Sequence, residues 1–67
     1  MTNTERVVRR LRRSPRLCDD CISEAESIRP RQQVNQICNR LRSEGVVERE
    51  SDLCRSCKRV KLVNLLR

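Results

Sequence analysis

Two Cys-x-x-Cys pairs constrain this chain more than any other feature of its sequence. The pairs are Cys18–Cys21 and Cys54–Cys57, and 32 residues separate them. A chain of only 67 residues has a small core, and small cores usually need a further cross-link. Two residues between cysteines let both sulfurs of one turn face the same ion, and two such turns complete a tetrahedral site. The spacing therefore predicts that these four cysteines hold one metal ion, with Zn²⁺ as the preferred ion.

Other uses of the four cysteines stay open at this point. Four thiolates also ligate iron–sulfur clusters, and redox dithiols or disulfides are further uses of such pairs. A thioredoxin-like dithiol needs a βαβ setting, which the pattern lacks. The odd number of cysteines and the lack of an export signal lead us to expect a cytoplasmic protein, where paired cysteines more often bind metal than form disulfides. Four thiolates leave no position for water, so the expected ion is structural.

No enzymatic activity is expected. The chain contains no histidine and a single glycine, so it lacks the commonest general base and a glycine-rich phosphate loop. The fifth cysteine, Cys38, has no base beside it and lies in an apolar helical stripe, so we interpret it as a small buried hydrophobe. No small-molecule substrate is expected either.

Capping signals and periodicity predict two helices in the first part of the chain. Thr2 and Glu5 have the spacing of a capping box, and the first helix is expected over about residues 3–13, before Pro15. A second helix is expected over about residues 19–27, capped by Asp19 or Asp20. The residues expected to face inward from it are Cys21 or Ile22, Ala25 and Ile28.

The third helix is expected over about residues 30–44. Pro30 suits the first helical position, and Gly45 suits the left-handed residue after a helix end. The apolar stripe of this helix is Val34, Ile37, Cys38 and Leu41. The opposite face carries Gln32, Gln36, Asn39 and Ser43.

After Gly45 the spacing of the apolar residues changes from that of a helix to that of β-strands. A β-hairpin is expected over about residues 46–66, with Cys54 and Cys57 in the turn at its tip. Leu17, Val60 and Leu62 are expected to extend the core where the hairpin returns. The fold class is therefore small α+β in one domain covering residues 1–67, with three helices, a two-stranded hairpin and a four-cysteine metal site.

The order of these elements resembles a winged helix-turn-helix. The segment from Arg29 to Arg49, RPRQQVNQICNRLRSEGVVER, is similar to the recognition helix and first wing strand of that family, above all at its Gly45-Val46-Val47 junction. The cysteine pairs depart from the family and look like zinc-ribbon knuckles. The resemblance implies that the third helix enters a DNA major groove and that the wing contacts the backbone.

Charge and residue type agree with a double-stranded DNA partner. The chain has a formal net charge of +7, and it has no aromatic residues, which disfavours single-strand binding by stacking. Glutamine suits adenine edges, and arginine suits guanine or phosphate. The residues expected to contact DNA are Arg29, Arg31, Gln32, Gln33, Gln36, Arg40, Arg55, Lys58, Arg59 and Lys61.

The sequence thus predicts a small zinc-binding protein that binds double-stranded DNA in transcriptional regulation, and two other functions remain as hypotheses beside it. The last strand is apolar on both faces, with Val60, Leu62 and Leu66 on one and Val63 and Leu65 on the other. A domain this small can hardly bury both faces, so a homodimer or a protein partner would cover the rest. A metal or redox sensor in which the cysteines respond is the other hypothesis. No apolar run exceeds two residues, so no membrane segment is expected.

Overall fold

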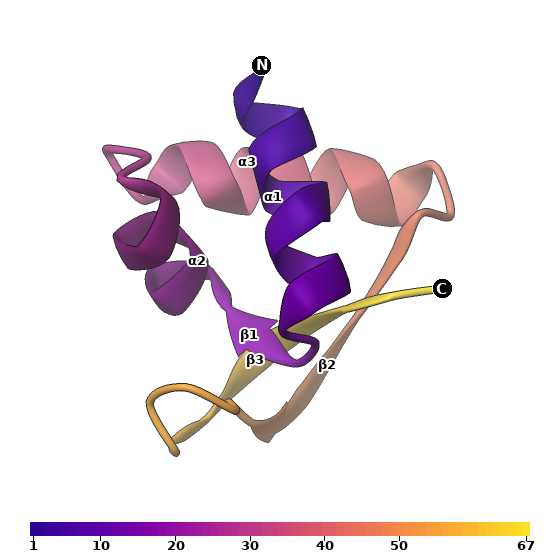
Figure 1. Ribbon diagram of the computed structural model, residues 1–67. Coiled ribbons are helices and arrows are strands. Elements are labelled where there is room, and N and C mark those ends of the chain that lie inside the picture. Colours follow the sequence, from indigo (N-terminus) through magenta and orange to yellow (C-terminus); the bar gives the residue numbers. More distant parts are fainter.

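Three helices precede a β-hairpin, as the sequence predicts. The computed structural model describes residues 1–67 (Figure 1). The elements in chain order are α1 (Asn3–Arg13), β1 (Leu17–Cys18), α2 (Asp19–Glu26), α3 (Gln32–Ser43), β2 (Val47–Leu53) and β3 (Val60–Leu66). The short strand β1 was not predicted. Together these elements form a small α+β fold.

Helix α1 begins with the predicted capping box. The Thr2 hydroxyl accepts a hydrogen bond from the Glu5 backbone N–H at 3.1 Å, and the Glu5 carboxylate accepts one from the Thr2 N–H at 2.9 Å. These two bonds satisfy backbone donors that a helix end leaves free. The bond from the Thr2 backbone, more than any other contact, lowers the pKa of Glu5. Val7 and Leu11 are the buried residues of this helix.

Helix α2 begins directly after β1, and the capping prediction for it was wrong. Cys18 occupies the N-cap position, and no side chain caps the helix. Asp19 is 3% exposed, because its carboxylate is used in contacts inside the protein rather than in a cap. Ile22 and Ile28 are buried as predicted, whereas Ala25 is exposed.

Helix α3 begins at Gln32, two residues after the predicted Pro30, and ends as expected. Its C-cap is Glu44, and Gly45 follows with φ of 77°. Val34, Cys38 and Leu41 are buried and Ile37 packs beside them, which confirms the predicted stripe. The opposite face, made of Gln32, Gln36, Asn39 and Ser43, is exposed.

The hairpin is part of a three-stranded antiparallel sheet with the order β1-β3-β2. Leu17 pairs with Asn64, and Asn64 pairs in turn with Arg49. Leu17 is buried, as predicted, but Val60 and Leu62 are 71% and 48% exposed. Their predicted place in the core was wrong, because the hairpin extends past the helices that cover its other end (Figure 1).

The core lies between the three helices and the covered end of the sheet. Its twelve buried hydrophobic residues are Val7, Leu11, Leu17, Cys18, Ile22, Ile28, Val34, Cys38, Leu41, Val47, Cys54 and Val63. Every helix and every strand contributes at least one of them. None of the helices has the length and hydropathy that a membrane crossing requires.

Candidate metal centre and the exposed face of helix α3

The two cysteine pairs meet in space. The sulfur atoms of Cys18, Cys21, Cys54 and Cys57 all lie within 4.8 Å of one another. The closest contact between the pairs is 3.6 Å, from Cys54 Sγ to Cys21 Sγ. The cluster links the β1–α2 junction to the turn of the hairpin, and it is a possible metal site.

Backbone hydrogen bonds bring the pairs together. In the turn between β2 and β3, the Cys54 N–H donates to the Arg59 carbonyl at 2.8 Å and the Lys58 N–H donates to the Cys54 carbonyl at 3.0 Å. The Arg55 N–H donates to the Arg16 carbonyl at 2.9 Å. This last bond ties the hairpin turn to the segment before β1. The sulfurs are therefore held by backbone geometry on both sides of the cluster.

The cluster favours ionisation of one cysteine. Burial opposes a charged Cys54, but backbone N–H groups of Cys57, Cys18 and Ser56 donate to its sulfur and lower its pKa to about 6. One of these bonds, from the Cys18 N–H, measures 3.4 Å. Burial raises the pKa of Cys18 to about 12 and also raises that of Cys21. Since metals bind thiolates, Cys54 is the sulfur most ready to accept an ion.

Cys38 lies apart from this cluster, in the core. Its side chain is 0% exposed, and burial raises its pKa to about 12. A thiol that is neutral and closed to solvent neither ionises readily nor meets a reagent. The interpretation of Cys38 as a small buried hydrophobe is confirmed.

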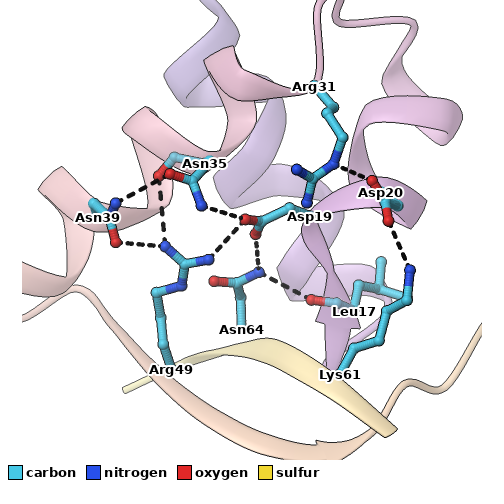
Figure 2. Close-up of polar contacts among 9 residues, drawn as sticks. All are labelled: Leu17, Asp19, Asp20, Arg31, Asn35, Asn39, Arg49, Lys61 and Asn64. Atoms are coloured by element: carbon cyan, nitrogen blue, oxygen red, sulfur yellow. Dashed lines mark hydrogen bonds and ion pairs between the residues drawn. The ribbon is translucent and has the colours of Figure 1, made fainter. Parts of the chain in front are cut away.

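A buried ion pair joins α2 to β2 beside the cysteine cluster (Figure 2). Arg49 Nη2 donates to Asp19 Oδ2 at 2.7 Å, and each side chain is only 3% exposed. Asp19 also accepts hydrogen bonds from Asn35 at 3.1 Å and from Asn64 at 2.9 Å. Three donors from three elements therefore converge on one carboxylate, that of Asp19, which directly follows Cys18 of the cysteine cluster.

The same ion pair holds two residues of α3. Arg49 Nη1 donates to Asn39 Oδ1 at 2.5 Å, and Asn39 Nδ2 donates to Asn35 Oδ1 at 3.2 Å (Figure 2). We call the five residues Asp19, Asn35, Asn39, Arg49 and Asn64 the polar network. It was not predicted. The alternation of β2 offered one signal, since a period of two from the buried Val47 places Arg49 on the same face of the strand.

The acidic residues of α2 are mostly paired. Asp20 contacts Lys61 at 2.6 Å and also contacts Arg31. The hydrogen bond from Lys61, with a further one from Arg31, lowers the pKa of Asp20, and the same bond raises the pKa of Lys61. Glu26 forms an ion pair with Arg10 at 2.7 Å. The negative charge of this helix is therefore largely neutralised within the protein.

The ten residues expected to contact DNA are exposed, except Lys61, which is half-buried. Four are engaged within the chain: Arg31 and Lys61 with Asp20, Gln33 with Asn3, and Arg40 with Thr4. The side chains of the other six, Arg29, Gln32, Gln36, Arg55, Lys58 and Arg59, form no hydrogen bond or ion pair in the structure. Helix α3 and the hairpin turn lie toward opposite ends of the molecule (Figure 1).

Comparison of the chain with protein-family models, with curated proteins and with solved structures finds no match in any of the three.

Proposed function

We propose that this chain is a zinc-binding domain of the winged helix-turn-helix type, which binds double-stranded DNA and acts in transcriptional regulation. The observation that carries the proposal is the exposed face of α3, where the Gln32 and Gln36 amides have no partner in the protein. In the winged-helix arrangement α3 is the recognition helix and the β2–β3 hairpin is the wing. Unpaired amides on such a helix are suited to the donor and acceptor pattern of adenine.

The sulfur geometry favours a single ion. Metal–sulfur distances of about 2.3 Å in a tetrahedral zinc site set the sulfurs about 3.8 Å apart. The four sulfurs here lie within 4.8 Å of one another, so a small contraction completes that site. In a multi-iron cluster the thiolates bind different irons and stand further apart. Zinc bound here would cross-link the hairpin to the β1–α2 junction, and the four thiolates would leave it no position for a substrate.

The polar network supports a recognition role for α3. Arg49 is anchored on Asp19 and contacts both Asn35 and Asn39, so β2 fixes the rotation of the helix about its axis. A helix held in this way presents its outer face in one orientation, which sequence readout requires. The pairing of Asp20 and Glu26 supports the proposal further, because it removes most of the repulsion that an acidic α2 would exert on phosphates.

The metal assignment is tested by elemental mass spectrometry of the purified chain. We expect one zinc per chain. Cys57→Ser should lose the ion, whereas Cys38→Ala should keep it, because Cys38 is in the core and outside the cluster. Iron in the wild-type protein, or no metal with five free thiols, would contradict the assignment.

DNA recognition is tested by selection from a random duplex pool at about 150 mM salt, since a basic chain binds any duplex at low ionic strength. We expect enrichment of defined sequences, which Gln32→Ala with Gln36→Ala should change or abolish. Gln33→Ala is the matched control, because its amide is already bonded to Asn3 and a smaller effect is expected. Arg29→Ala, at an exposed position three residues before α3, should weaken binding to all duplexes equally and lower the slope of log affinity against log salt by about one. Enrichment of the same duplex sequences by the wild type and the double variant would contradict the role of α3 in sequence recognition.

A further inference from the structure

Three aliphatic side chains stand exposed at the end of the hairpin. Leu53 is 50% exposed, Val60 is 71% exposed and Leu62 is 48% exposed. Met1 is the single other large hydrophobic residue exposed to a similar degree. A domain this small was not expected to bury both apolar faces of the last strand, and it covers the face of Val63, which is 0% exposed, and Leu65, which packs against the core, but leaves Val60 and Leu62 on the other face exposed. The uncovered apolar surface is therefore confined to one place.

The three residues share one face of the hairpin. Leu53 pairs with Val60 across the strands, and Leu62 lies two residues further along β3, opposite Ser51. Paired residues, and residues two apart on a strand, point to the same side of a sheet. We call Leu53, Val60 and Leu62 the hairpin patch. It continues the face that carries Val47 and Arg49, but it lies beyond the reach of the helices that cover them.

The turn beside the hairpin patch is cationic, and Asp52, the acidic residue next to Leu53, is paired with Arg16 at 3.9 Å. The segment 54–61 contains Arg55, Lys58, Arg59 and Lys61 and no acidic residue. Lys61 is paired with Asp20, while the side chains of the other three form no ion pair in the structure. Two of these three, Arg55 and Lys58, line a surface hollow together with Leu53 and Arg16. An aliphatic centre with a rim of unpaired cations has the composition of a protein-binding site rather than of a solvated hairpin end.

We infer that the hairpin patch docks a partner protein through a segment that carries aliphatic side chains flanked by Asp or Glu. The aliphatic side chains would cover Leu53, Val60 and Leu62, and the acidic ones would pair with Arg55, Lys58 and Arg59. A second copy of this chain is disfavoured, because two chains of charge +7 would bring the same cations face to face. DNA is disfavoured at this spot, because phosphates gain nothing from contact with exposed aliphatic groups. The inference does not depend on the DNA-binding proposal.

The test is selection of peptides from a random 16-residue display library against the immobilised, zinc-loaded protein. We expect enriched peptides that combine Leu, Ile, Val or Phe with Asp or Glu. Synthetic peptides of that sequence should bind the variant Val60→Ser with Leu62→Ser at least about tenfold more weakly than wild type. Enrichment of basic peptides, or none above the input library, would overturn the inference.

Charge variants provide the second measurement. Arg59→Glu beside the patch should weaken the selected peptides about tenfold or more. Arg12→Glu, which makes the same charge change on exposed α1, should change their affinity little. Zinc content and far-UV circular dichroism establish that each variant is folded. Equal losses of peptide affinity in Arg59→Glu and Arg12→Glu would show that the net charge of the protein, and not the position of the cation, determines binding. That result would overturn the assignment of the site.

The alternative occupants are tested with the same double variant. Sedimentation equilibrium should find wild type and variant equally monomeric, and both should bind a 20-bp duplex with equal affinity. A dimer that dissociates on substitution of Val60 and Leu62 would assign the patch to a second copy. A loss of duplex affinity comparable with the peptide loss would assign it to DNA. Either result would overturn the inference.

Discussion

Replacing Asp19 by alanine tests the physical reasoning about the polar network most directly. The Asp19 carboxylate is 2.7 Å from Arg49 Nη2, and both side chains are 3% exposed. Asp19→Ala therefore leaves an arginine charge buried without a counter-ion. It also removes the acceptor of the Asn35 and Asn64 amides, which lie 3.1 and 2.9 Å away. We expect the free energy of unfolding to fall more than for any surface substitution.

The size of the effect follows from the burial of the pair. Removing one partner of a buried ion pair costs about 3–5 kcal/mol. A domain of 67 residues has a total stability of about 3–10 kcal/mol at 0.05–0.15 kcal/mol per residue. Asp19→Ala is therefore expected to lower Tm by at least about 12 °C, since a small domain loses about 4–8 °C per kcal/mol. The matched control is Asp20→Ala. Its side chain is 43% exposed, so its ion pairs contribute about 1 kcal/mol or less.

The assay is thermal and urea unfolding in saturating zinc. Far-UV circular dichroism is the appropriate signal, because the chain has no aromatic residue to provide fluorescence. Zinc content is measured for each variant, since Asp19 and Asp20 both lie next to Cys18 or Cys21. Equal losses of stability for Asp19→Ala and Asp20→Ala at equal zinc content would refute the reasoning.

A double-mutant cycle separates the ion pair from its surroundings. Asp19→Leu combined with Arg49→Met removes both buried charges, so it should cost clearly less than the sum of the two single substitutions. Additive losses would mean that the two charges do not depend on each other, in contradiction to their 2.7 Å contact.

Three further predictions address the helix ends and the cysteines. Thr2→Ala should lower the free energy of unfolding by about 1 kcal/mol through loss of the capping box. Ser14→Ala is its control, because the Ser14 side chain makes no hydrogen bond. Gly45→Ala should cost about 1–2 kcal/mol, because φ is 77° although the nearest atom to an added Cβ is 3.8 Å away. Urea titrations measure both costs. Cys57→Ala should abolish retention of zinc in competition with a chelator, and Cys38→Ala should preserve it.

The elements that were predicted correctly have local signals. The capping box of Thr2 and Glu5 and the left-handed Gly45 mark the ends of α1 and α3 within a few residues. The apolar stripe from Val34 to Leu41 marks the buried face of α3 by its period alone. The meeting of the cysteine pairs was predictable as well, because the repeated spacing calls for four ligands around one ion.

The features that were missed depend on residues distant in sequence. Strand β1 has two residues and exists only because it pairs with β3, so it has no periodicity to read. Asp19 and Arg49 are 30 residues apart, and each one alone is typical of a solvated surface. Val60 and Leu62 are exposed because the hairpin is longer than the part that the helices cover. The apolar character of the two residues gives no information about that length.

Binding of one metal ion by the two cysteine pairs would make the stability of the chain depend on metal supply. An ion bound by all four sulfurs closes a segment of 32 residues between Cys21 and Cys54, which holds the whole of α3 and β2. Unfolding separates these ligands, so metal and fold are lost together. Above the dissociation constant, each tenfold rise in free ion then adds about 1.4 kcal/mol to stability. We therefore predict that Tm rises steadily with the logarithm of free zinc, and that proteolysis of the chain slows in step.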